Sequence, residues 1–186
     1  MKDITLFKKE NSIFLKVITK KEDLKKDDMV EGYLIDADEK TARRIIDSLK
    51  KSNKIIALQG RDNAFNRRAI ETLKINYLVN VEFGSKKDGL KQRDSGINHV
   101  VAKEAAKKGI GFVIDFNYLR MLDGEELARV LSRIIQNIKI CRRAKVEIKL
   151  ASFAESKNDL PNEKDIEGFL TSLGMSSQQV KTAKKF

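Results

Sequence analysis

Residues 54–69 read Lys-Ile-Ile-Ala-Leu-Gln-Gly-Arg-Asp-Asn-Ala-Phe-Asn-Arg-Arg-Ala and contain the clearest structural signal in the chain. The first part, Lys54–Leu58, is apolar on both faces, as expected of a strand that is covered on both sides. The second part places Phe65 and Ala69 at helical spacing, with a helix start at Asp62 or Asn63. A buried strand followed at once by an amphipathic helix predicts a β/α unit.

The same alternation extends in both directions from this unit. Short apolar runs predict further strands at Ile13–Ile18, Gly32–Ala37, Tyr77–Val81, Gly111–Phe116 and Val146–Ala151. Helical periodicity predicts helices after Asp38, after Ser95, from Asp123 with Glu126 completing a capping box, from Pro161, and at a short last segment capped by Ser176 or Ser177. This order of elements predicts the α/β class with mostly parallel strands.

Six predicted strands and five or six helices favour a small or incomplete (β/α) barrel. An eight-unit barrel takes about 250 residues, and this chain has 186. We find no internal repeat and no linker, so residues 1–186 are expected to form a single domain. The last strand alternates apolar residues with Glu147 and Lys149, which suggests a sheet edge or one solvent-exposed face.

The charge of the chain favours a polyanionic partner. Lysine and arginine number 38 against 27 acidic residues, a formal net charge of +11. Nucleic acid is the favoured partner because each paired phosphate releases counterions, although lysine-rich compositions also arise from solubility or heat tolerance. The single cysteine, Cys141, excludes an intrachain disulfide and fits a core position in a reducing cytosol. No apolar run approaches the roughly 20 residues of a membrane span, and no signal peptide opens the chain, so we expect a cytoplasmic protein without membrane contact.

The scarcity of histidine argues against a class of enzymes. His99 is the only histidine, so a catalytic metal site built from several histidines is excluded. A carboxylate-only Mg²⁺ site stays open but has no distinguishing pattern.

Residues 93–103, Arg-Asp-Ser-Gly-Ile-Asn-His-Val-Val-Ala-Lys, form a second informative stretch. Ser95 is a plausible N-cap, and Gly96 permits close approach of a ligand or a neighbouring backbone. Free N–H groups at such a helix start are suited to a phosphate. His99 and Lys103 share one helix face. The alternative is a core helix with a solvated basic side.

These two stretches resemble the motifs of a known family. Residues 93–103 are similar to R-D-x-G-x-N-H-x-x-A-[KR] of ribonuclease P protein component 3, and Leu58–Ala69 resembles that family's x-x-G-G-D-x-x-x-N-R-x-A. A weaker match, Pro161–Ile166, resembles P-x-[DE]-[KR]-D-[IL]. The resemblance covers about residues 31–180 and implies a modified TIM-like barrel. Residues 1–30 depart from the family's opening and look abbreviated, which leaves barrel closure open; a partner or the loop Asn80–Gln92 would cover an open side.

The resemblance also implies a function. The chain is expected to be a protein subunit of ribonuclease P, the ribonucleoprotein that matures the 5′ ends of precursor tRNA. In the family, the RNA performs hydrolysis with Mg²⁺, and the protein stabilises that RNA together with ribonuclease P protein component 2. We therefore expect no catalytic residue in the chain and no metal or cofactor bound by it.

The placement of the motifs predicts the residues that meet RNA. Both motifs follow strands, and ligands gather at the carboxyl ends of parallel strands, so we expect one shared rim. The candidate RNA-binding residues are Arg61, Arg67, Arg68, Lys86, Lys87, Lys91, Arg93, His99 and Lys103. The candidate structural residues of the motifs are Gly60, Asp62, Asn66, Asp94, Gly96 and Asn98.

Several of these assignments have structural alternatives. Arg67 and Arg68 are adjacent on a helix, so only one of them is expected to reach the rim. Asn66 is expected to tie the Gly60 loop, and Asp94 to orient Arg93 or cap the helix. A packed or hydrogen-bonded histidine is the preferred interpretation of His99.

Two other functions remain open on the residues alone. A free-standing metal-dependent phosphoesterase on a TIM-like barrel requires Asp36, Glu82 and Asp115 to converge. An assembly module would present apolar residues of the helix Asp123–Arg143 to a protein partner. The basic run 142–145 is explained by favourable charge at a helix C-terminus, with an RNA contact as the alternative.

Overall fold

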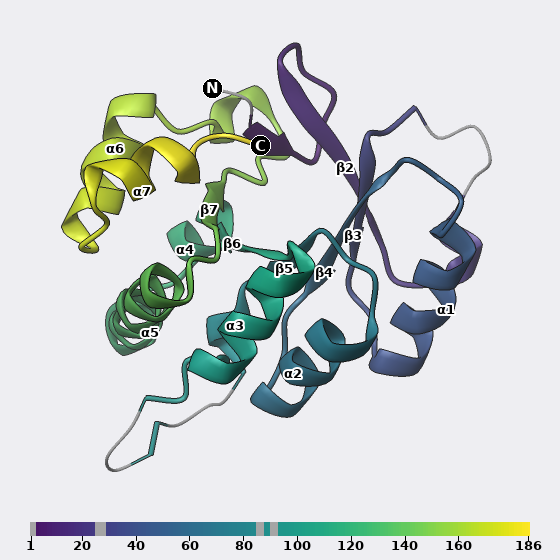
Figure 1. Ribbon diagram of the computed structural model, residues 1–186. Helices are drawn as coiled ribbons and strands as arrows, with labels where there is room; N and C mark the ends of the chain where they lie inside the picture. The colour runs from purple at the N-terminus through teal and green to yellow at the C-terminus, as the bar shows by residue number, and fades with distance from the viewer. Residues whose placement is uncertain (1–2, 25–28, 85–87, 90–92) are drawn as a thin grey trace.

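The computed structural model describes residues 3–24, 29–84, 88–89 and 93–186. Its seven strands are all parallel and lie in sequence order (Figure 1). They are β1 (Asp3–Thr5), β2 (Ser12–Ile18), β3 (Gly32–Ile35), β4 (Ile55–Gln59), β5 (Tyr77–Val79), β6 (Gly111–Asp115) and β7 (Ile148–Ala151). The predicted α/β class with parallel strands is confirmed.

The first and last strands meet and bring the sheet round into a barrel. Thr5 and Ala154 form a parallel bridge, the Leu6 amide donates to the Ala154 carbonyl at 2.9 Å, and the Phe153 amide donates to the Ile4 carbonyl at 3.0 Å. The segment that looked abbreviated in the sequence therefore supplies the closing strand. This architecture is a TIM-like barrel with seven strands in place of eight.

The helices of the described chain surround the strands on the outside (Figure 1). They are α1 (Glu39–Leu49), α2 (Asn63–Thr72), α3 (His99–Lys108), α4 (Phe116–Met121), α5 (Gly124–Ala144), α6 (Glu163–Ser172) and α7 (Ser177–Ala183). Short 3₁₀ turns are η1 (Lys21–Asp23), η2 (Val81–Phe83) and η3 (Lys157–Asp159). Within the described residues, no helix has the length and apolarity needed to cross a bilayer.

Two details of the helix prediction are wrong. Asp123 precedes α5 but makes no side-chain capping bond, so the predicted capping box with Glu126 does not form. The helix predicted from Pro161 begins two residues later at Glu163, because Asn162 is the residue whose side chain accepts the Lys164 amide. The short helix α4 was not predicted, since six residues are too few to show a periodicity.

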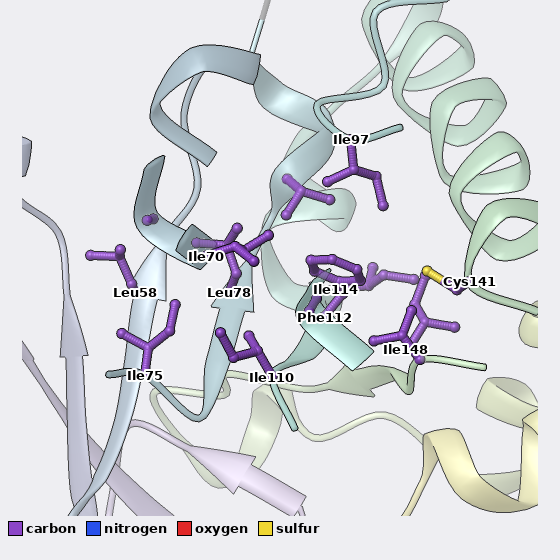
Figure 2. Packing of buried hydrophobic residues seen from close by; sticks show 14 of the residues in the cluster. Leu58, Ile70, Ile75, Leu78, Ile97, Ile110, Phe112, Ile114, Cys141 and Ile148 are labelled. Carbon is purple, nitrogen blue, oxygen red and sulfur yellow. The ribbon is translucent and has the colours of Figure 1, made fainter. Parts of the chain in front are cut away.

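Two apolar cores hold the barrel together. The inner core contains Ile4, Ile13, Leu15, Leu34, Ala57, Val79, Val113, Ala151 and Phe153. The outer core lies between strands and helices, where Leu78 and Phe112 face Ile70 of α2 and Cys141 of α5 (Figure 2). Each fully buried aliphatic or aromatic side chain contributes about 1.5–3 kcal/mol. Cys141 is buried and free, and burial raises the pKa of its thiol.

Of the two alternatives for the last strand, a sheet edge or a solvent-exposed face, β7 is the last strand in the sheet order, and the exposed face is wrong. Every residue of β7 is buried, including Lys149 at 6% exposure. Lys149 pairs in register with Val113 of the inner core, and its ammonium donates to the Lys185 carbonyl and lies 3.1 Å from Glu147. The ammonium also lies 5.2 Å from the ring centroid of Phe186. The polar alternation therefore reflects a lysine held by the C-terminal segment.

Candidate nucleic-acid interface

The first motif forms the tight turn between β4 and α2. The Gly60 amide donates to the Val79 carbonyl at 2.7 Å, and a Cβ at this position would lie 2.7 Å from the same oxygen. Asp62 caps α2, since its Oδ1 accepts the Phe65 amide at 2.7 Å. The turn thus requires a glycine for close packing and an acceptor to begin the helix.

Asn66 connects the two motifs from a fully buried position. Its Oδ1 accepts the Arg61 amide at 2.8 Å, and its Nδ2 lies 2.9 Å from the Arg61 carbonyl. The same Nδ2 lies 3.2 Å from the Val81 carbonyl and 3.1 Å from the Gly96 carbonyl. One amide side chain therefore joins the β4–α2 turn, η2 and the loop that precedes α3.

Gly96 brings the second motif against η2. Its φ is +80°, and an added Cβ would lie 1.6 Å from the Val81 carbonyl oxygen. The close approach that the sequence suggested is thus made by a neighbouring backbone.

The helix of the second motif begins later than predicted. Asn98, not Ser95, caps α3: its Oδ1 accepts the Val100 amide at 2.9 Å and the Val101 amide at 3.0 Å. Ser95 is buried, and its hydroxyl contacts the Ile97 carbonyl and accepts from Gln136. The left-handed turn at Gly96 postpones the helix until Asn98. Two first-turn N–H groups are consequently occupied, so the predicted cradle of free N–H groups is wrong.

A groove of about 1460 Å³ opens at this loop, between α2, the start of α3 and the second half of α5. Arg67, Arg93, His99 and Arg143 line it, together with polar Asn63, Asn98 and Gln136. The side chains of Arg93, His99 and Arg143 are exposed and make no hydrogen bond or ion pair with any other described residue. Arg67 also lies there but is paired with Glu71 at 2.7 Å.

The groove lining also contains two carboxylates, Asp88 and Asp94, and both are engaged within the protein. Arg133 of α5, only 1% exposed, donates to Asp88 at 2.8 Å and to the Glu82 carbonyl at 2.9 Å. Burial opposes ionisation of Asp88, but the hydrogen bonds from Arg133 and the Asp94 amide hold its pKa below the ordinary value. Asp94 accepts from Asn63, so it neither caps α3 nor pairs with Arg93. The groove therefore keeps cationic side chains available for an anion.

The other predicted cations that the structure describes do not line the groove. Arg61 pairs with Asp36 at 2.9 Å, and Arg68 turns toward α1 to pair with Glu39 at 2.6 Å. Lys103 is exposed on α3 outside the groove lining. Lys86, Lys87 and Lys91 lie outside the described residues. Arg61, Arg68 and Lys103 thus lie outside the groove lining, and Asp36 after β3 and Glu39 of α1 pair with two of them.

The sequence analysis missed Gln136 as a groove residue and gave Arg143 an RNA contact only as an alternative. With Ile140 they lie at helical spacing on one face of α5, which is the signal the sequence offered. Arg142 points elsewhere and donates to Gln179 at 2.7 Å and to the Gly174 carbonyl at 2.5 Å. The basic run at the end of α5 is therefore divided between a structural arginine and a groove arginine.

The carboxylates required by a metal-dependent phosphoesterase do not assemble. Among the described residues, no group of three histidine, cysteine or acidic side chains is placed to hold a metal ion. Asp36 pairs with Arg61, and Asp115 caps α4 through the Tyr118 amide at 2.9 Å. Burial, aided by the charge of Asp115, raises the pKa of Glu82 to about 7, and burial raises the pKa of Asp115 to about 6. These environments suit structural carboxyl groups better than metal ligands.

The fold and the groove define a TIM-like barrel protein whose cationic concave surface is built by helices and a loop outside the barrel. The chain belongs to the RNase P subunit p30 family, whose model matches residues 15–185. The resemblance drawn from the two motifs is confirmed.

Curated relatives agree with this membership. Ribonuclease P protein component 3 of Methanocaldococcus jannaschii is 32% identical over 136 residues, which cover 72% of this chain and 56% of the relative. The protein of that name from Methanothermobacter thermautotrophicus is 30% identical over 156 residues, covering 82% and 60%. The chain thus spans less than two thirds of the length of these relatives.

Solved structures share the fold. A chain of an archaeal ribonuclease P solved with mature tRNA matches with a TM-score of 0.72 and 23% identity, covering 98% of this chain and 86% of that one. An amidohydrolase matches with a TM-score of 0.60 and 13% identity, covering 84% and 41%. At these identities the likeness establishes the barrel fold.

Proposed function

We propose that this chain is a protein subunit of ribonuclease P that binds and stabilises the catalytic RNA during 5′ maturation of precursor tRNA. The observation that carries the proposal is the convergence of Arg93, His99 and Arg143 on one groove, with no side-chain hydrogen bond or ion pair from them to another described residue. Family membership and the names of the relatives support it. The phosphoesterase alternative is not favoured, since its carboxylates are engaged elsewhere.

The chemistry of the groove suits the backbone of folded RNA. A guanidinium donates two parallel hydrogen bonds to a phosphate and keeps its charge at every relevant pH. Among the described residues, the lining contains no Phe, Tyr or Trp ring, and His99 is its one aromatic side chain on which a base would stack. Recognition of closely spaced phosphates fits this lining better than reading of single-stranded bases. The proposed contribution is therefore relief of phosphate repulsion where RNA strands approach each other.

The proposal includes the partners expected of the family. The chain would act beside ribonuclease P protein component 2 on the ribonuclease P RNA, and would reach precursor tRNA through the assembled particle. Mg²⁺ would be used by the RNA, with no metal, cofactor or catalytic residue supplied by this chain. We expect the particle to act in the cytoplasm.

The test of the groove is a salt titration of RNA binding. The affinity of the full chain for ribonuclease P RNA is measured by fluorescence anisotropy at several salt concentrations. Arg93→Ala combined with Arg143→Ala is expected to weaken binding and to lower the slope of log K against log salt by roughly 1.5, since each lost phosphate contact removes about 0.7–0.9.

A matched control separates the effect of losing groove arginines from the effect of lowering the net charge. Arg44→Ala combined with Arg68→Ala removes the same charge from exposed positions outside the groove lining and should leave the slope close to wild type. Equal losses in the two double variants would contradict the groove assignment. Cleavage of precursor tRNA by the purified chain alone would contradict the non-catalytic role.

A further inference from the structure

A second exposed surface lies around the helix α4, and we call it the aromatic–acidic surface. Its apolar members are Phe83, Tyr118 and Met121. The Tyr118 and Phe83 rings pack edge to face, with centroids 4.3 Å apart. Tyr118 is 37% exposed and Met121 is 71% exposed. Tyr118 and Met121 thus meet solvent, and Phe83 is partly buried beneath them against the core.

The helix explains why these side chains cannot be buried by the barrel itself. Tyr118 and Met121 are three residues apart on α4 and so lie on the same face. Leu119, on another side of the helix, is the residue that reaches the core, at 4% exposure. Rotating α4 to hide Met121 would expose Leu119.

Carboxylates surround the apolar members. Burial raises the pKa of Tyr118, and the charges of Glu126 and Asp115 raise it further, which places both carboxylates near the ring. Glu155 in turn acts on Asp115. Asp123 and Glu125 add two exposed carboxylates at the junction of α4 and α5. These five acidic residues complete the definition of the surface.

Two arginines accompany these five carboxylates. Arg129 lies 3.5 Å from Glu126. Arg120 of α4 donates to the Asp159 carbonyl. The aromatic–acidic surface is therefore locally acidic on a chain whose net charge is +11.

We propose that the aromatic–acidic surface docks a protein partner through a basic segment that places an apolar side chain against Tyr118 and Met121. Phosphates would be repelled by the five carboxylates, whereas lysine and arginine side chains would complement them. Aromatic and methionine side chains are enriched at protein interfaces, where they act as anchors. The inference rests on the proposed function in one respect, since the ribonuclease P particle supplies the partner.

The surface and the groove can be occupied at the same time. Glu126 and Gln136 are ten residues apart on α5, which corresponds to about 15 Å along the helix axis. One long helix thus carries a protein-facing first part and an RNA-facing second part. The two functions should respond to different substitutions.

The experiment uses the full chain, with ribonuclease P protein component 2 from the same organism as the probe. Its binding is measured by isothermal titration calorimetry, and RNA binding of each variant is measured in parallel. Tyr118→Ala with Met121→Ala is expected to weaken binding of component 2 at least tenfold and to leave RNA affinity within twofold of wild type. Glu125→Lys with Glu126→Lys should weaken binding similarly.

Matched controls test whether the position matters. Met29→Ala alters a methionine that is 79% exposed elsewhere, and Glu10→Lys reverses an exposed carboxylate elsewhere. Both should bind component 2 as wild type does. Circular dichroism melts of each variant verify that the fold is retained.

The outcomes separate this inference from the proposed function. Wild-type affinity of the surface variants for component 2, or no binding of component 2 by the wild-type chain, would overturn the inference alone. Loss of RNA affinity in the surface variants would also overturn it, by making the surface an RNA contact. Binding of component 2 through this surface by a chain that binds no RNA would support the inference and overturn the RNA role.

Discussion

Glu82 holds a carboxyl group at a site that excludes water. The residue is 1% exposed, and its Oε1 has no hydrogen-bond partner among the described residues. Burial raises its pKa to about 7, the nearby charge of Asp115 adds to the effect, and the charge of Arg133 opposes it. Glu82 is therefore mostly protonated at pH 6 and ionised above pH 8.

This environment predicts a dependence of stability on pH. The pKa of Glu82 is higher in the folded chain than the ordinary value of 4.5. The stability that this difference contributes to the folded state is therefore fully present below pH 4.5 and is lost as the pH rises through 7. The free energy of unfolding should fall by on the order of 2 kcal/mol between pH 5 and pH 8, with Asp115 contributing below pH 7.

Urea denaturation of Glu82→Gln at pH 5 to 8 measures the effect. In this variant, the free energy of unfolding should no longer fall above pH 6. The fall at lower pH that Asp115 causes should remain. Glu10→Gln, at an exposed position, should keep the wild-type dependence. An unaltered profile in Glu82→Gln would contradict the assignment.

At the scale of elements, the loop before α3 is held by close backbone contact with η2. Gly96 combines a left-handed φ of +80° with a carbonyl oxygen at the place a Cβ would occupy. Gly168 in α6 is the opposite case, since an added Cβ there meets nothing within 4 Å. The two glycines thus form a matched pair for the same substitution.

We expect Gly96→Ala to destabilise the protein by roughly 2–5 kcal/mol, because strain at a left-handed position adds to a steric clash. Gly168→Ala should stabilise it by about 0.5–1 kcal/mol through helix propensity. Chemical denaturation of both variants measures the difference. A Gly96→Ala protein as stable as wild type would show that η2 and the loop separate easily.

At the scale of the whole molecule, the barrel depends on residues from the two ends of the chain. Asp3 of β1 accepts the Ser152 amide at 2.9 Å, and both residues are buried. This bond spans 149 positions in sequence and lies beside the Thr5–Ala154 bridge. The closing contacts therefore link the first strand to the segment after the last.

Removing the carboxylate of Asp3 tests how much its hydrogen bond to the Ser152 amide contributes to closure of the barrel. Asp3→Ala leaves a buried amide without its partner and should cost about 1–3 kcal/mol. Asp3→Asn keeps an oxygen acceptor and should cost less. Thermal unfolding of both variants compares them; equal losses would mean that the charge of Asp3, not its hydrogen bond, matters for closure.

The fold was largely predictable because its signals are local. Short apolar runs placed six strands, and spacings such as Phe65–Ala69 placed the longer helices. Elements of three to six residues, β1 and α4, were missed because a period needs more residues to become visible. The start of α3 was misplaced because the left-handed turn at Gly96 is imposed by Val81, fifteen residues away.

The candidate site was predictable only in part, because some of the contacts that decide it join residues far apart in the sequence. The motif around Arg93 and His99 is contiguous in sequence, so residue types alone pointed to an anion. Arg61 and Arg68 were removed from the groove by Asp36 and Glu39, acidic partners 25 and 29 positions away. Arg143 entered it because α5 packs beside α3. Chain order encodes periodicity and caps, whereas the pairing of charges depends on contacts that form when distant segments meet.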